Sequence, residues 1–312
     1  MQEFLTIGFL TTFLSAAVRT GMPLVCAAVG EDTSEKAGII NVGLEAVMIA
    51  GAFSGFVAAF LTNSLALGFL CGMAGGVAVS LLHAFLAVYL RQDQNVSGVA
   101  LNLLVTGITS YLYLLIVNRY GMPQVETLPA LPIPGLCRIP VLGEALFNRD
   151  LVTYLLYVVI AALVFFYRRT AWGMSLCAVG ENPRAADTVG LPVYRIQYLA
   201  AAFNGLMAGL GGAYLILGQL GVFYENITAG RGYIALAVVV FGRRRPLGIL
   251  LAALFFGAAD ALQFRLQALG VALPTQLFTS LPYILTVLSL LLVAKRNTDP
   301  AWLGKPYVRS RR

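Results

Sequence analysis

The side chains of this sequence that could do chemistry are a few polar residues set inside long apolar runs. Asn41 and Glu45 stand four residues apart, a spacing that places both side chains on one face of a helix. Asn102 and Asn204 interrupt two later runs. Polar groups at such positions usually face the interior of a helical bundle and often line the route of a solute. The alternative is that the amides only join helices by hydrogen bonds, at about 1 kcal/mol or less each.

Two carboxylates, Glu45 and Asp260, lie within apolar runs and need a partner. An unpaired charge in an apolar medium costs far more free energy than a paired one. We expect these carboxylates to pair with Arg19, Lys36 or Arg265, or to line water. In a transporter driven by an ion gradient, the same groups would bind a proton or a sodium ion.

A segment of mixed chemistry, residues 218–232, precedes a short apolar run and combines glycines, aromatic rings and amides. Aromatic faces together with amides suit a polar ligand with flat rings or sugar hydroxyls. Aromatic residues also gather where a helix meets the membrane surface, which is the alternative interpretation. The candidate residues for contact with a solute are Asn41, Glu45, Asn102, Asn204, Gln219, Glu225, Asn226 and Tyr233.

The motifs of catalysis are absent from the sequence. It has no G-x-x-x-x-G-K-[ST] loop to cradle a nucleotide phosphate, no H-E-x-x-H zinc motif and no G-x-S-x-G nucleophile motif. The single histidine, His83, and the scattered cysteines Cys26, Cys71, Cys137 and Cys177 lack the spacing of metal ligands. We therefore predict a chain that is not an enzyme and binds no cofactor or metal. If its work consumes ATP, another protein must supply the ATPase.

The composition indicates that lipid surrounds most of the chain. Of the 312 residues, 59% are hydrophobic and 11% are charged, whereas a soluble domain has roughly 25% charged residues. The mean hydropathy is +0.82. The apolar runs are continuous and longer than the alternating strands of a membrane β-barrel, so the spans are helices. The net charge of +7 comes from basic residues at the ends of these runs, which indicates membrane topology and not nucleic-acid binding.

The apolar runs predict a single transmembrane domain, residues 1–312, built as an all-α bundle of about eight to ten spans. Long runs occupy residues 4–29, 39–61, 65–90, 96–117, 151–167, 196–217, 247–264 and 277–294, and a shorter one covers 232–242. Arg19, Gly21 and Pro23 interrupt the first run. It is therefore either one broken helix or two short ones.

Basic residues predict the side of the membrane on which each connecting segment lies. The cytoplasmic side is expected to hold Lys36, residues 91–95, 168–195 and 243–246, and a basic tail at 295–312. That side then collects 15 of the 21 Lys and Arg residues. Such an excess of positive charge is typical of cytoplasmic loops.

This orientation requires the short run 232–242 to cross the membrane. Helical residues rise 1.5 Å each, so this run covers only about 16 Å of a hydrocarbon core of about 30 Å. The crossing is expected to recruit non-helical residues around 226–231. Such backbone is tolerated at membrane depth only inside protein or beside a water-filled cavity. The segment is thus an interior element beside the route of a solute, or a short helix simply buried in the bundle.

Residues 168–195 contain the most distinctive polar sequence. Asn182 can cap a helix that begins with Pro183 and ends at Gly190. The result is a short helix of small residues between two spans, suited to docking in a groove of a partner protein. The alternative is a plain helix at the membrane surface.

Three stretches carry a likeness to a known family: EKAGIINVGLEAVMIAGAF (35–53), AVGENPRAADTVGL (178–191) and GQLGVFYENITAGRGYIALAVVVFGRRRPLGILLAALFFGAADALQ (218–263). They resemble the permease subunits of ATP-binding-cassette (ABC) importers, in the group that handles branched-chain amino acids, ribose and nucleosides. The GRGYIALA run and the LGKPY sequence at 303–307 are similar to the nucleoside branch.

The resemblance implies a multi-pass protein of the bacterial inner membrane that imports nucleosides by alternating access. Two permease chains, often related paralogues, would form the route. A dimer of cytoplasmic ABC ATPases, which bind ATP and Mg, would drive it, and a substrate-binding lipoprotein or periplasmic protein would deliver the solute. The coupling helix of the family, which contacts the ATPase, matches Glu181, Asn182, Pro183, Arg184, Ala185, Ala186 and Asp187. A sugar or a branched-chain amino acid is the alternative cargo, and a stand-alone secondary transporter is the alternative class.

Overall fold

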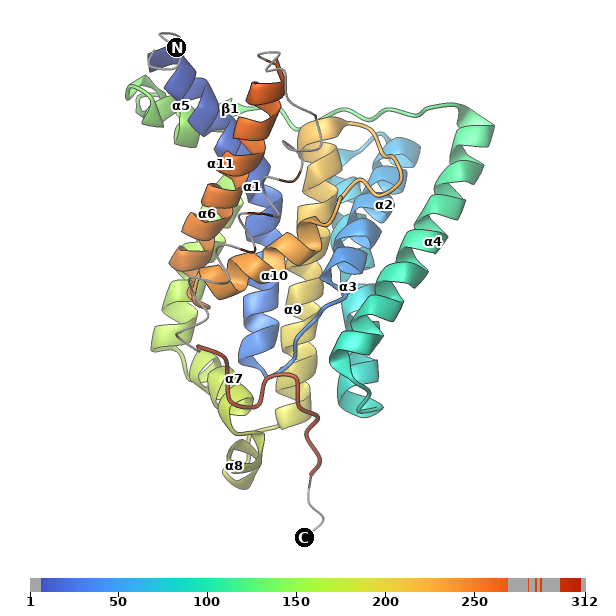
Figure 1. The fold of residues 1–312 in the computed structure, drawn as a ribbon, viewed down its shortest axis with the longest axis vertical. Helices are drawn as coiled ribbons and strands as arrows, with labels where there is room; N and C mark the ends of the chain where they lie inside the picture. The colour runs from blue at the N-terminus through green and yellow to red at the C-terminus, as the bar shows by residue number, and fades with distance from the viewer. Residues whose placement is uncertain (1–6, 269–279, 281–283, 285–286, 288–297, 310–312) are drawn as a thin grey trace.

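The computed structural model describes residues 7–268, 280, 284, 287 and 298–309, which form a bundle of membrane-length helices (Figure 1). The elements are α1 (Ile7–Lys36), α2 (Leu44–Thr62), α3 (Leu65–Ala84), the π-helical η2 (Phe85–Tyr89), α4 (Gln94–Tyr120), β1 (Leu131–Pro132), the 3₁₀ turn η3 (Leu136–Arg138), α5 (Leu142–Phe147), β2 (Asn148–Arg149), α6 (Leu151–Arg169), α7 (Ala171–Glu181), α8 (Pro183–Thr188), α9 (Val193–Tyr214), the π-helical η4 (Leu215–Leu220), α10 (Arg231–Phe241) and α11 (Pro246–Ala268).

The predicted all-α membrane fold is confirmed. Within the described residues, seven helices are long and apolar enough to cross a membrane, and α10 is a shorter apolar helix. The only strands described are β1 and β2, which pair antiparallel with Leu131 opposite Arg149. The predicted run 277–294 lies, apart from residues 280, 284 and 287, outside the described part of the chain.

The centre of the bundle is formed by α1 and α9, with α2 and α3 packed beside them (Figure 1). In the apolar part of α9, 78% of the residues are buried inside the protein, against 17% for α4. Helix α4 therefore lies at the edge, and its outward side chains face the surroundings of the bundle. The buried polar residues of α1 and α9, such as Glu31 and Asn204, have no such access and must find partners within the protein.

Glycines allow α3 and α9 to approach closely. A Cβ added to Gly209 of α9 would lie 2.6 Å from the carbonyl oxygen of Gly72 and 2.9 Å from the Cα of Gly76. Any larger side chain at Gly209 would force the two backbones apart. Small residues at helix contacts are the usual means of close packing in membranes.

The first apolar run is one continuous helix, α1, in spite of Pro23 inside it. A proline in a helix removes the N–H that would bind the carbonyl four residues earlier, here that of Arg19. This carbonyl instead accepts a hydrogen bond of 2.5 Å from the Gln219 side chain, and the Arg19 guanidinium donates to the Gln219 carbonyl at 3.0 Å. The sequence left open whether this run is one broken helix or two short ones. The structure shows one continuous helix over Ile7–Lys36.

The short apolar run 232–242 is present as a helix, α10, which lies across the direction of α1 and α9 (Figure 1). Helix α10 has 11 residues and is preceded by a non-helical segment, residues 221–230. Asn226, Ala229 and Gly230 adopt positive φ angles of 55°, 45° and 78°, which turn the chain before the helix begins. Thr228 in this segment is fully buried. The irregular backbone is thus enclosed by protein at Ile227 and Thr228, where such backbone needs protein around it, whereas residues 224–226 are exposed.

The segments predicted to share the cytoplasmic side lie at one end of the bundle. Lys36 donates to the carbonyl of Arg244 at 2.6 Å, and the Gly180 carbonyl accepts from the Trp302 N–H at 3.0 Å. The segment 121–150 lies at the other end, where Arg149 donates to Ser15 at 2.5 Å. The structure thus groups the connecting segments in the two sets that the charge pattern predicts.

Candidate transport site and coupling surface

Glu45 holds the start of α10. This residue lies in the first turn of α2, and its carboxylate accepts hydrogen bonds from the Thr228 hydroxyl, from Gly230 N–H at 2.8 Å and from Gly232 N–H at 2.6 Å. The first N–H groups of a helix lack partners within it and carry partial positive charge. Glu45 therefore caps α10 from a different helix. The expected pairing of Glu45 with a cation is wrong, because these three donors satisfy the carboxylate.

Asn102 of α4 performs a similar role for α2. Its side-chain oxygen accepts from Ala46 N–H at 2.8 Å, and its amide donates to the Val42 carbonyl at 3.2 Å. The same amide donates to the Tyr233 hydroxyl at 2.6 Å. One side chain thus joins α4, the start of α2 and the first turn of α10. Glu45, Asn102 and Tyr233 form one cluster around the beginning of α10.

A second cluster is built on Glu31, which the sequence analysis did not single out. Glu31 is fully buried near the end of α1. Its two carboxylate oxygens accept from Asn41 N–H and from the Asn204 side-chain amide of α9, each at 2.7 Å. Glu31 lies two positions past the predicted end of the first apolar run, so its burial was not expected. Only the long-range pairing with Asn204 reveals it.

The predicted common helix face of Asn41 and Glu45 is wrong. Helix α2 begins at Leu44, and Asn41 lies in the turn before it. The Asn41 backbone points to Glu31 while Glu45 points to α10, so the two residues serve different clusters. The Asn41 side chain is buried, and neither its oxygen nor its nitrogen has a hydrogen-bond partner among the described residues.

The remaining candidates lie apart from these clusters. Gln219 is engaged with Arg19 of α1. Glu225 and Asn226 are exposed in the segment before α10. Asp260 of α11 pairs with Arg231 at 3.6 Å, which corrects the expected pairing with Arg19, Lys36 or Arg265.

The described residues contain no group of three or more His, Cys, Asp or Glu side chains placed to hold a metal ion. The Cys177 thiol lies in α7, outside the membrane spans, and burial raises its pKa above the ordinary value. It thus stays uncharged near neutral pH and acts as a packing residue.

The predicted short helix of residues 168–195 is present as α8. The Asn182 side chain accepts from Ala185 N–H at 3.1 Å, Pro183 opens the helix and Gly190 follows it with a φ of 84°. Its preceding helix, α7, was not predicted. Pro183 and Ala186 face the protein, while Glu181, Asn182, Arg184 and Ala185 are exposed at the lower end of the molecule, and Asp187 is half-buried (Figure 1).

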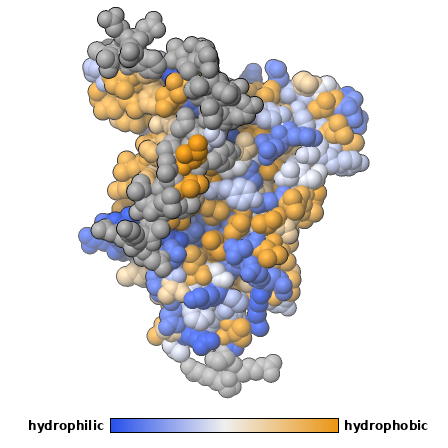
Figure 2. Space-filling model, in the orientation of Figure 1, coloured by the Kyte–Doolittle hydropathy of each residue, from blue (hydrophilic) through white to orange (hydrophobic). Residues whose placement is uncertain are grey.

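Residues 298–309 strap α7 and α8 to the end of α1. The Trp302 and Gly304 N–H groups donate to the carbonyls of Gly180 and Gly38, at 3.0 Å and 3.1 Å. Arg309 pairs with Asp187 of α8 at 3.2 Å. From the sequence these residues were predicted only to be a basic tail. Their contacts are with residues far away in the chain, which local sequence patterns do not reveal. Hydrophilic side chains gather over this end of the molecule in Figure 2.

An ion cluster, largely buried except at Asp299, joins this strap to the turn between α10 and α11. The Arg244 guanidinium contacts Glu35 at 2.7 Å and Asp299 at 2.5 Å. Lys36 pairs with Asp32 and donates to the Arg244 carbonyl. The end of α1, the end of α10 and the strap are therefore held together by charge.

Comparison with known proteins identifies the family. The family model for the permease component of the branched-chain amino acid transport system matches residues 13–293. The chain is 37% identical to the guanosine ABC transporter permease protein NupQ of Bacillus subtilis, over 98% of this chain and 99% of that protein.

Two other relatives are similarly close. TsgC13 of Haloferax volcanii, named as a candidate glucose ABC transporter permease, is 40% identical over 86% of this chain and 81% of its own length. The nucleoside ABC transporter permease protein NupC of Lactococcus lactis is 33% identical over 93% of this chain and 94% of that protein. The chain belongs to the family of branched-chain amino acid transport system permease components, and it is the multi-pass membrane subunit of an ABC importer, in which a separate protein is the ATPase.

Proposed function

We propose that this subunit lines the route by which nucleosides enter the cell by alternating access. The observation that carries the proposal is α10, an 11-residue apolar helix inside the bundle whose start is held by Glu45 of α2. Transporters commonly bind their solutes where a helix is short or interrupted near the middle of the membrane. The contacts of Asn102 with Val42 and Tyr233 make the same place a junction of three helices.

Asn41 and Tyr233 are the side chains best suited to contact the solute. The Asn41 amide offers a donor and an acceptor that make no hydrogen bond within the described residues. A buried polar group left in this state costs about 1–3 kcal/mol, which a solute with matching groups would recover. The Tyr233 side chain is 45% exposed and presents an aromatic ring to stack on a flat base. Asn204, which donates to Glu31, and Asn102, which donates to Tyr233, would then position the groups on either side of the solute.

The names of the relatives support a nucleoside and leave glucose as the second candidate. NupQ and NupC are named for guanosine and for nucleosides. TsgC13 is named for glucose and has the higher identity of 40%. Both cargos carry sugar hydroxyls, so the base is the part that distinguishes them. Membership of the ABC permease family argues against a stand-alone secondary transporter.

Uptake by the assembled importer tests the cargo. The complex, with its ATPase and binding protein, is reconstituted in liposomes and supplied in turn with labelled guanosine and labelled glucose. Unlabelled guanosine, uridine, ribose, glucose and leucine serve as competitors of guanosine uptake. We expect both nucleosides to compete and the other solutes to leave uptake unchanged. Uptake of labelled glucose with no uptake of guanosine would overturn the nucleoside assignment.

The energy for transport is proposed to enter at Glu181, Asn182, Pro183, Arg184, Ala185, Ala186 and Asp187, where a dimer of cytoplasmic ABC ATPases docks. The support is geometric: α8 is a capped helix at the end of the molecule with Arg184 exposed. Arg184→Ala and Asp187→Asn should leave ATP hydrolysis running while uptake falls at least about tenfold. Arg91→Ala, an exposed arginine outside α8, is the control. Normal uptake in both α8 variants would contradict the docking role.

The full importer proposed here contains a second, related permease chain and a substrate-binding lipoprotein or periplasmic protein. Its place is the inner membrane of a bacterium, with α8 in the cytoplasm. The excess of basic residues at the end of the bundle that carries α8 supports this orientation. Purification of the importer through a tag on this chain, with the subunits identified by mass spectrometry, tests the composition.

A further inference from the structure

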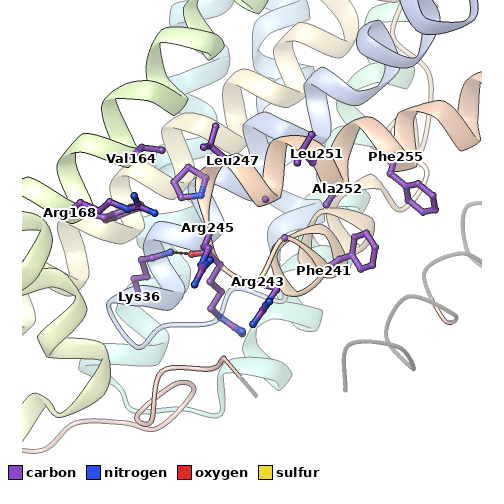
Figure 3. A pocket seen from close by; sticks show the side chains of 15 residues that line it. Lys36, Val164, Arg168, Phe241, Arg243, Arg245, Leu247, Leu251, Ala252 and Phe255 are labelled. Atoms are coloured by element: carbon purple, nitrogen blue, oxygen red, sulfur yellow. Dashed lines mark hydrogen bonds between the residues drawn. The ribbon is translucent and has the colours of Figure 1, made fainter. Parts of the chain in front are cut away.

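A large cavity opens between α6, α11 and the turn that joins α10 to α11 (Figure 3). Its volume is about 770 Å³. It lies at the end of the bundle that holds Lys36 and the basic connecting segments. None of the residues assigned above to the solute route or to ATPase docking lines it, so the cavity is separate from the transport site.

Three arginines surround this cavity and carry free charge. Arg168 extends from α6 toward the turn that carries Arg243 and Arg245 (Figure 3). All three are exposed, and none makes an ion pair with the described residues. Lys36 and Arg244 also line the cavity, but their charges are paired with Asp32, Glu35 and Asp299. Among the described residues no acidic side chain lines the cavity, so these residues make its mouth positive.

An apolar stripe leads away from the arginines along α11. Leu247, Leu251 and Phe255 follow one another at intervals of four residues and so lie on one face of the helix. Their side chains are 57%, 69% and 44% exposed. The stripe begins two residues after Arg245 and runs into the membrane span for about 12 Å. The positively charged mouth of the cavity is therefore continuous with this exposed apolar stripe.

We propose that this cavity binds an anionic phospholipid. The phosphate of the headgroup lies among Arg168, Arg243 and Arg245, and an acyl chain follows Leu247, Leu251 and Phe255. Basic pockets between membrane helices on the cytoplasmic side recognise acidic headgroups. A soluble phosphate would use only the arginines and a neutral lipid only the stripe, whereas an anionic phospholipid uses both. The proposal does not depend on which solute the importer carries.

Lipid competition on the assembled importer tests the site. The purified complex in detergent is titrated with fluorescently labelled phosphatidylglycerol, and unlabelled phosphatidylglycerol, phosphatidylcholine and inorganic phosphate serve as competitors. Only the first should displace the label. Since each basic residue near a headgroup contributes about a fivefold gain in affinity, Arg168→Gln/Arg243→Gln/Arg245→Gln should weaken binding about 100-fold.

A matched variant removes the same charge elsewhere. Arg91→Gln/Arg169→Gln/Arg195→Gln takes away three exposed arginines that do not line the cavity, and it should bind as the unaltered complex does. If the cavity triple variant does not assemble, Arg168→Gln and Arg245→Gln are measured singly, each with about a fivefold loss expected. Equal binding by the two triple variants, equal competition by phosphatidylcholine, or displacement by phosphate would each overturn the proposal.

Discussion

Several polar side chains of this permease satisfy backbone groups of a helix other than their own. Glu45 caps α10 and Asn102 caps α2. Gln219 donates to the Arg19 carbonyl, which has no backbone donor because Pro23 lacks an N–H. A lipid surrounding offers no water to such groups, so every free end must be satisfied inside the protein. Several residues that the sequence suggests as solute ligands therefore join helices of the bundle by hydrogen bonds.

The Glu45 cap predicts a graded loss of stability. Glu45→Ala leaves the donors at Thr228, Gly230 and Gly232 unpaired and should cost about 3–5 kcal/mol, because each buried unpaired group costs about 1–3 kcal/mol. Glu45→Gln retains one acceptor oxygen and should cost less. Thermal unfolding of the purified importer measures both. Glu225→Ala, an exposed carboxylate before the same helix, is the control, and an equal loss there would refute the cap.

The Gln219 contact predicts a coupled pair of substitutions. Gln219→Leu leaves the Arg19 carbonyl without its side-chain donor and should destabilise the protein by about 1 kcal/mol, the net contribution of an ordinary hydrogen bond. Pro23→Ala restores the N–H that this carbonyl would bind in an ordinary helix. The double variant should thus be more stable than Gln219→Leu alone. Thermal unfolding of the four proteins gives the coupling free energy, and simple additivity would contradict the account.

At the scale of elements, most helices were predictable because lipid demands long apolar stretches. The run 65–90 corresponds to Leu65–Tyr89, and 151–167 to Leu151–Arg169. The capped helix α8 followed from local residue types, with Asn182 before Pro183. These features depend on neighbours in the sequence, so composition and spacing are sufficient to predict them.

The parts that could not be predicted depend on distant partners. Helix α1 continues through Glu31, Asp32 and Glu35, which lie beyond the predicted end of the first apolar run at residue 29. Their burial makes sense only with Asn204 and Arg244, which lie 173 and 209 residues away from Glu31 and Glu35. The start of α2 was set too early for a related reason, since the turn at Asn41 is fixed by Glu31.

The packing of α3 and α9 predicts the effect of one methyl group. Gly209→Ala places a Cβ 2.6 Å from the Gly72 carbonyl oxygen, so the helices must separate and the importer should lose several degrees of thermal stability. Gly107→Ala is the matched control, because a Cβ there meets no atom within 4 Å. It should be neutral or stabilising by up to about 1 kcal/mol. Equal effects of the two substitutions would contradict the packing account.

At the scale of the whole molecule, charge and contacts agree on two opposite ends. We predict that Glu225 faces outward and that Thr188, after the proposed coupling residues, faces the cytoplasm. Single cysteines at these positions, in a background without the native cysteines, test this with a maleimide that does not cross membranes. The cysteine at 225 should react in intact cells, and the one at 188 only in inverted vesicles. The reverse pattern would invert the topology.

The cap on α10 also constrains how the protein is made. Glu45 and Thr228 are 183 residues apart, so at about 5–20 residues per second Glu45 leaves the ribosome roughly 10–40 s before its partner exists. During that interval α2 must wait in the translocation machinery or at the membrane with an unshielded carboxylate. Nascent chains that stop before residue 228 are therefore expected to be substrates for membrane proteases.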